Sequence, residues 1–146
     1  PTEVEQEPDE REAGERALLN FGHTFGHALE NLLGYGKWLH GEAVAAGMVA
    51  AARFSARCGR LDAASADRIT ALLERLRLPV GIPAEASPEA IWAAMRSDKK
   101  TAGGRPKLVL AEAIGRAVIA ADYDEAMVRR TLADLTKAGA TDELAV

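Results

Sequence analysis

The 146-residue sequence holds three histidines, and all of them lie within one short window: His23, His27 and His40. Neutral imidazoles are common zinc ligands, and a catalytic zinc site uses three protein ligands and keeps one position open. On a helix, His23 and His27 would share a face, with their Cβ atoms roughly 5–6 Å apart. His40 could fold back to the same point, and Glu42 follows it by two residues. This clustering favours a shared metal site over three unrelated polar histidines.

Two further polar residues precede the histidines at helical spacing. Asn20 lies three residues before His23, and Arg16 lies four residues before Asn20. An arginine can bind a carboxylate or a phosphate through two parallel hydrogen bonds. A solvated helix face is the alternative, but this stripe lacks the Lys and Glu residues that usually cover such a face. The stripe therefore indicates a surface that binds an anion beside the histidines.

Gly22 and Gly26 lie within the apolar stripe of the same segment. A glycine in a helix interior is less favourable than alanine by up to about 1 kcal/mol. Two such residues within five positions indicate a close approach, either by a neighbouring helix or by a ligand.

Hydrophobic spacing predicts a mainly α domain, a helical bundle with a short two-stranded β-hairpin. The expected units are an acidic lead-in over 1–12, a helical domain over 13–137 and a frayed tail over 138–146. The expected elements are helices over 13–33, 42–57, 65–76, 88–96 and 124–137, and strands over 108–111 and 117–120. Candidate N-caps are Asp62 or Ser65, Ser87 before Pro88, and Asp122 or Asp124.

Composition excludes several classes of function. Apolar residues make up 48% and charged residues 27%, which is an ordinary globular balance. A net charge of −4 argues against nucleic-acid binding, and no apolar run is long enough for a membrane span. The single cysteine, Cys58, excludes an internal disulfide and fits a reducing, cytoplasmic environment.

Several sequence strings resemble 3-dehydroquinate synthase, a sugar phosphate cyclase. These strings are RALLNFGHTFGHALE over 16–30, WLHGEAVAAGM over 38–48, Asp98-Lys99-Lys100 and KLVLAEAIG over 107–115. The resemblance spans about residues 9–120 and concerns only the helical C-terminal half of that two-domain, α/β plus α enzyme. The N-terminal NAD-binding half of the family is not expected in this chain, since no G-x-G-x-x-G strand–turn–helix is present.

The resemblance implies a carbon–oxygen lyase of the shikimate pathway, which serves aromatic amino acid biosynthesis. The family converts 3-deoxy-D-arabino-heptulosonate 7-phosphate to 3-dehydroquinate and phosphate. It uses NAD⁺ and a divalent metal, Zn²⁺ or Co²⁺, and commonly forms homodimers in the cytoplasm. The expected partners are therefore a sugar phosphate substrate and the chain's own NAD-binding half, with no nucleic acid and no membrane.

The resemblance also assigns roles to the three histidines. It makes His23 and His40 the metal ligands and leaves His27 beside the substrate, where it assists proton movement. Spacing alone would instead pair His23 with His27. The third ligand of the family is a glutamate that precedes this chain. We therefore expect the isolated chain to be inactive and to bind zinc weakly.

The remaining site residues would bind the anionic substrate. By the same resemblance, Arg16 and Asn20 contact the substrate, and either Lys99 or Lys100 contacts its phosphate. These positions favour the dehydroquinate branch over another sugar phosphate cyclase. A non-catalytic helical metal-binding module is the other alternative. A hydrolase of the H-E-x-x-H type is disfavoured, because Thr24 stands where that motif has glutamate.

Overall fold

The structure is a computed structural model and describes residues 21–34, 38–96, 106–113, 116–120 and 122–145, with side chains described as far as Thr136. Within these residues the fold is mainly α with one β-hairpin, as the sequence predicts. None of the helices in the described residues is long and apolar enough to cross a membrane.

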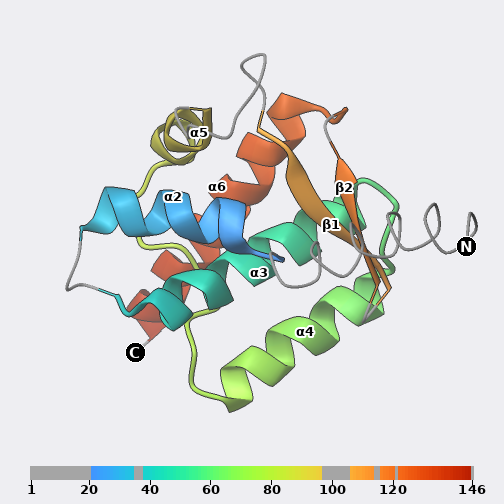
Figure 1. Cartoon of the computed structure of the whole chain (residues 1–146). Helices are drawn as coiled ribbons and strands as arrows, with labels where there is room; N and C mark the ends of the chain where they lie inside the picture. The colour runs from blue at the N-terminus through green and yellow to red at the C-terminus, as the bar shows by residue number, and fades with distance from the viewer. Residues whose placement is uncertain (1–20, 35–37, 97–105, 114–115, 121, 146) are drawn as a thin grey trace, which may run out of the picture.

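The central element is α3, which spans His40–Arg57 and contacts α2, α4, α6 and strand β1. Figure 1 shows it running through the middle of the molecule. Its inner positions are mostly alanine, and alanines from Ala43 to Ala52 are almost fully buried. Small side chains let neighbouring elements approach a helix closely from several sides. The prediction of a buried central helix over 42–57 is therefore confirmed, with a start two residues earlier.

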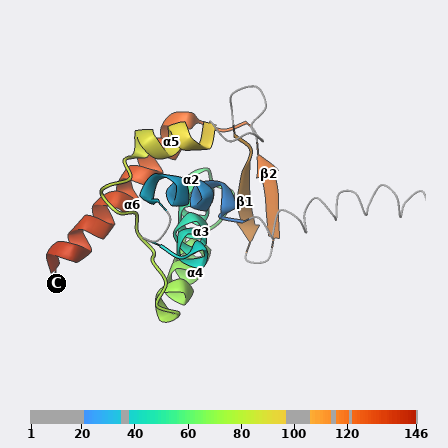
Figure 2. The same ribbon diagram turned by 60° about the vertical axis from the view of Figure 1, so that its left-hand side comes forward.

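Two shorter helices cover one side of α3. Helix α2 spans His23–Leu33 and packs against both α3 and α5, which spans Pro88–Arg96. The predicted cap of α5 is confirmed, because the Ser87 hydroxyl accepts a hydrogen bond from the Ala90 N–H at 3.1 Å. Figure 2 shows α5 and the beginning of α6 side by side above α2.

On the opposite side of α3 lies α4, which spans Ala63–Arg75. Of the two candidate caps, Asp62 is the one used: its carboxylate accepts a hydrogen bond from the Ser65 N–H at 2.9 Å. Arg53 of α3 reaches across to Asp67, with 2.7 Å between the guanidinium and carboxylate atoms.

We expect Asp62→Ala to lower the melting temperature of the protein near pH 7. Hydrogen bonds from the Ser65 side chain and backbone hold the pKa of Asp62 below its ordinary value of 3.8. Its stabilising effect is thus present above pH 3.8 and is lost as the pH falls through the lower folded-state pKa. Thermal melts of the two proteins should therefore converge as the pH falls below the folded-state pKa of Asp62. Asp62→Asn keeps an oxygen acceptor and is the control; equal melting temperatures for Asp62→Ala and the parent at pH 7 would contradict the assignment.

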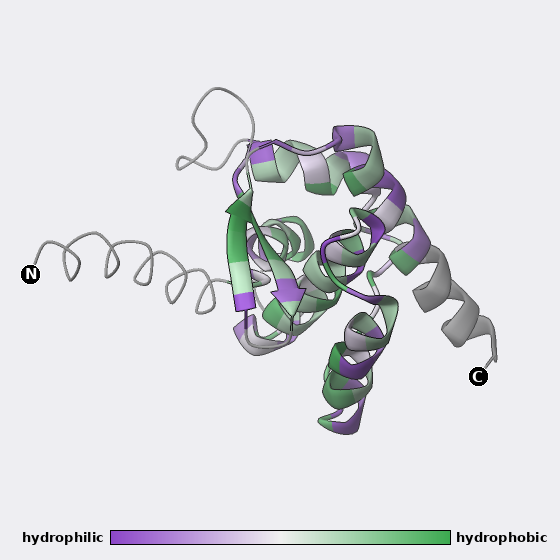
Figure 3. Cartoon of the chain, turned by 90° about the vertical axis from the view of Figure 1, so that its right-hand side faces the viewer, coloured by the Kyte–Doolittle hydropathy of each residue, from purple (hydrophilic) through white to green (hydrophobic). Residues whose placement is uncertain are grey.

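The β-hairpin closes one end of the core. Strand β1 (Leu108–Ala113) pairs antiparallel with β2 (Arg116–Ala120), and both extend one or two residues beyond the prediction at the turn. The buried Ser55 hydroxyl links the hairpin to α3: it accepts from the Ala111 N–H at 2.9 Å and donates to the Ala51 carbonyl at 2.6 Å. Figure 3 shows the hairpin beside the helices, with β2 mostly hydrophobic.

The last helix, α6, spans Glu125–Ala145 and packs on α3 and α5. Asp124 is its cap, because its carboxylate accepts from the Ala126 N–H at 2.9 Å. The predicted helix end at 137 is wrong, because the backbone is helical as far as Ala145. No proline interrupts this segment, and its alanines have the highest helix propensity.

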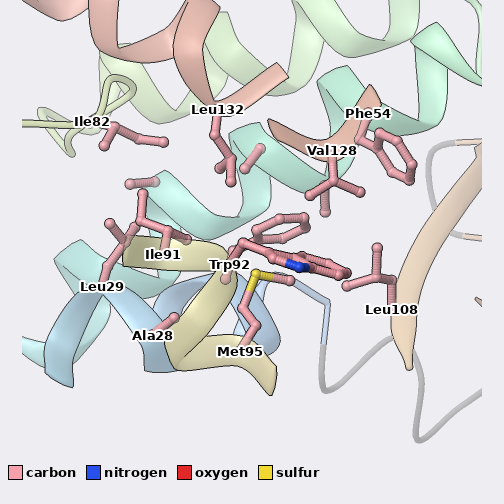
Figure 4. Close-up of a cluster of buried hydrophobic side chains, with 14 of the residues drawn as sticks. Ala28, Leu29, Phe54, Ile82, Ile91, Trp92, Met95, Leu108, Val128 and Leu132 are labelled. Carbon is pink, nitrogen blue, oxygen red and sulfur yellow. The ribbon is translucent and has the colours of Figure 1, made fainter. Parts of the chain in front are cut away.

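The core lies where α2, α3, α5, α6 and β1 meet, as Figure 4 shows. Three aromatic rings meet edge to face within it: Tyr123 lies 5.9 Å from Phe54 and 6.2 Å from Trp92, between ring centroids. Aromatic pairs favour this arrangement. The other large buried side chains are Leu29, Ile82, Ile91, Met95, Leu108, Leu110, Val128 and Leu132.

Candidate metal and substrate site

A contact between glycines sets the distance between the two helices that carry the histidines. A Cβ atom on Gly47 of α3 would lie only 2.1 Å from the Gly22 carbonyl oxygen. A Cβ atom on Gly26 would lie 3.0 Å from the Ala43 carbonyl oxygen. The backbones of α2 and α3 therefore touch along this seam. Of the two explanations for Gly22 and Gly26, the structure supports close helix packing.

The prediction of one continuous helix over 13–33 is wrong at Gly22. Its φ of +84° is left-handed and cannot belong to an α-helix, so α2 begins only at His23. A Cβ atom on Gly22 would lie 2.7 Å from the Met48 nitrogen of α3, so this position also leaves no room for a side chain. Arg16 and Asn20 lie outside the described residues, and the break means that a single helical stripe does not connect them to His23.

The rings of His23 and His40 lie together although the residues are 17 positions apart (40 − 23). Their centroids are 5.7 Å apart and their planes are inclined by 49°. Each histidine is the first residue of its helix, α2 and α3 respectively. The packing of α2 on α3 brings the two rings together. Sequence spacing could not predict this pairing of His23 with His40.

The environment of His23 favours its neutral form. Burial lowers the pKa of His23 below its ordinary value, and the positive charges of His40 and His27 lower it further, against a smaller opposing effect of Glu30. A neutral imidazole carries the lone pair that a metal ion requires. His23 is therefore prepared to act as a ligand near neutral pH.

The pair fits a divalent metal ion. Zinc holds imidazole nitrogen at about 2.0–2.1 Å, which puts two rings on one tetrahedral ion roughly 5 Å apart between centroids. The observed 5.7 Å is within a small side-chain adjustment of that value. The described residues contain no group of three histidine, cysteine or acidic side chains arranged around one such point. Two imidazoles by themselves do not supply the three protein ligands of a catalytic zinc site.

Glu42, the carboxylate that the sequence places near the histidines, caps the start of α3. Its Oε1 accepts a hydrogen bond from the Leu39 N–H at 2.8 Å, which satisfies a free donor at the start of α3. The structure therefore does not bring Glu42 together with two histidines in one site.

Glu30 is the residue that the sequence analysis missed. Its Oε1 lies 2.7 Å from Nδ1 of His40, and its side chain is only 16% exposed, against 64% for His40. Glu30 follows His27 by three residues and His23 by seven, so it continues their face of α2. That spacing was visible in the sequence, but the partner on α3 was not.

His27 lies on the same face of α2 and is exposed. It is close enough for its charge to lower the pKa of His23. Its ring therefore lies near His23 and is open to solvent.

The basic segment that carries Lys99 and Lys100 lies outside the described residues. The described residues on either side of it are placed near the histidines. α5, which ends at Arg96, packs on α2. On the other side, the Thr24 hydroxyl, next to His23, donates a hydrogen bond to the Lys107 carbonyl at 3.4 Å.

Comparison with known families gives this geometry a context. A family model described as "3-dehydroquinate synthase C-terminal" matches residues 2–101, more than two thirds of the chain. The chain belongs to this family. The match contains all three histidines, Glu30 and the seam of glycines between α2 and α3.

Several solved structures are similar to this chain, and two of them are sugar phosphate cyclases. One is 2-epi-5-epi-valiolone synthase from Streptomyces hygroscopicus subsp. jinggangensis 5008, solved with NAD⁺ and Zn²⁺ bound. It is 28% identical, with a TM-score of 0.73, over 83% of this chain and 33% of that one.

Another is a 2-deoxy-scyllo-inosose synthase complexed with carbaglucose-6-phosphate, NAD⁺ and Co²⁺. It is 23% identical with a TM-score of 0.68, over 85% of this chain and 35% of that one. At that identity the likeness concerns the fold alone. The chain spans about a third of the length of these relatives.

Proposed function

We propose that this chain is the metal- and substrate-binding part of a sugar phosphate cyclase, and that the enzyme is a 3-dehydroquinate synthase. The pairing of His23 with His40 across the seam between α2 and α3 is the observation that carries the proposal. It supports the assignment of these two residues as metal ligands, in a chain whose family match is to 3-dehydroquinate synthase. In this proposal His27 and one of Lys99 and Lys100 contact the substrate.

A divalent metal ion and NAD⁺ would supply chemistry that histidine side chains cannot. When bound, a divalent metal polarises a substrate hydroxyl and NAD⁺ accepts a hydride. The described residues suit the metal, whereas they offer no nucleotide-binding strand–turn–helix. We therefore assign NAD⁺ binding to a separate half of the enzyme, which would cover the exposed ring of His40.

The residues of this chain then divide the work. His23 and His40 hold the metal, and their fixed helices set where the substrate hydroxyls lie. His27 carries a proton to or from the substrate, since histidine exchanges protons readily near neutral pH. Arg16, Asn20 and one of Lys99 and Lys100 bind the carboxylate and the phosphate, because such anions need cationic and hydrogen-bonding partners.

A second cyclase is also supported by a specific observation. The similar structure at 28% identity is a 2-epi-5-epi-valiolone synthase, so a different sugar phosphate is the alternative substrate. Arg16 and Asn20 favour a substrate that carries a carboxylate, and they are the reason for preferring the dehydroquinate branch.

Turnover by the longest native polypeptide that contains these residues tests the proposal. The protein would be supplied with NAD⁺ and Zn²⁺ or Co²⁺, and products from 3-deoxy-D-arabino-heptulosonate 7-phosphate and from sedoheptulose 7-phosphate would be identified by mass spectrometry. We expect 3-dehydroquinate and phosphate from the first substrate and no carbocycle from the second. Turnover of sedoheptulose 7-phosphate alone would contradict the dehydroquinate assignment. The 146-residue chain by itself should show no turnover.

A further inference from the structure

The Glu30–His40 pair has a geometry that a simple surface ion pair does not need. Glu30 lies mostly buried on α2, while the ring of His40 at the start of α3 is largely exposed. The carboxylate can only accept, so Nδ1 of His40 donates the hydrogen bond of 2.7 Å. This bond fixes which tautomer the imidazole adopts and in which direction its other nitrogen points.

We propose that Glu30 is a positioning residue for the metal site, a carboxylate that holds His40 so that Nε2 is the metal-binding atom. The inference rests on the proposed function, because it assigns a role within the same site. Histidine ligands of metals commonly donate their second ring N–H to a carboxylate, which orients the ring and makes it a stronger base. Glu30 supplies that carboxylate to His40 from α2, the neighbouring helix.

The alternative of Glu30 as a direct ligand is less favourable. Its Oε1 is already hydrogen-bonded to Nδ1 of His40, and its side chain is only 16% exposed.

The test compares metal affinity in Glu30→Ala, Glu30→Gln and the parent. Zn²⁺ dissociation constants would be measured by competition with a chromophoric chelator, on the longest native polypeptide that contains these residues. Glu30→Ala should weaken zinc binding about 10–100-fold, the usual effect of removing such a partner. Glu30→Gln keeps an oxygen that can accept from Nδ1, so it should recover most of the lost affinity. Glu74→Gln, which removes an exposed carboxylate on α4, is the matched charge control and should bind zinc normally.

Two spectroscopic readouts separate positioning from direct ligation and from a purely structural role. The absorption bands of the Co²⁺-loaded protein should keep their shape in Glu30→Ala, because the ligands are unchanged. Long-range ¹H–¹⁵N spectra of the metal-free protein should show the Nδ1–H tautomer of His40 in the parent and the Nε2–H tautomer in Glu30→Ala. Circular dichroism should show the same fold for every variant.

The outcomes are distinguishable from those for the proposed function. Unchanged zinc affinity in Glu30→Ala, absence of zinc binding by the parent, or altered cobalt bands would each overturn the role of Glu30. None of these measurements involves turnover of a sugar phosphate. If the parent turned over neither substrate while Glu30→Ala lost affinity as described, the positioning role would stand and the proposed function would fail.

Discussion

A Gly47→Ala protein is expected to lose at least about 3 kcal/mol of folding stability, at the upper end of the usual penalty for overpacking. The added Cβ would lie 2.1 Å from the Gly22 carbonyl oxygen and 2.7 Å from the Gly26 nitrogen. Both are backbone atoms, so the clash cannot be relieved by turning a side chain. The two helices must separate, and urea unfolding monitored by circular dichroism would measure the effect.

Gly41→Ala is the matched control for this prediction. Gly41 lies near the start of the same helix, and a Cβ atom there meets nothing within 4 Å. Alanine has the better helix propensity, so this change should leave stability unchanged or raise it slightly. If Gly47→Ala and Gly41→Ala unfolded at the same urea concentration, the seam of glycines would not be what fixes the separation of α2 and α3.

The second large effect concerns the division of labour among the histidines. In the active enzyme we expect His27→Ala to keep its metal and lose roughly 10²–10⁴-fold in turnover, the range usual for a proton-transferring group. His23→Ala and His40→Ala should lose metal and activity together. Metal content after desalting, measured by plasma mass spectrometry, and turnover of the same samples would be compared. Release of the metal by His27→Ala would show that the roles are assigned wrongly.

The elements that were predicted well are those whose signals are local. Helix α5 begins at the Ser87-Pro88 cap and ends at Arg96, both visible in the sequence. The hairpin was predicted from two short apolar runs on either side of a glycine. The hydrogen bond that joins it to α3 through Ser55 was not predicted, because nothing in the sequence marks Ser55 as a partner of the hairpin. The end of α6 was missed because Gly139, a residue type that often follows a helix end, lies inside this helix, which continues to Ala145.

The errors at the site have a common cause, which is contact between segments distant in the sequence. Gly22 was placed inside a helix, because the sequence shows neither its left-handed φ nor its close contact with Met48 of α3. Spacing paired His23 with His27, whereas the crossing of α2 and α3 pairs His23 with His40. The resemblance to a family supplied the second pairing. Glu30 was missed because its partner lies on the other helix.

The location of the metal in a crystal of the zinc-loaded protein tests the central claim most directly. Anomalous diffraction at the zinc absorption edge would show one strong peak about 2.0–2.1 Å from a ring nitrogen of His23 and from a ring nitrogen of His40. The ring of His27 should lie beside this peak but outside bonding distance. A peak that joins His23 to His27, or separate ions on His23 and His40, would contradict the account.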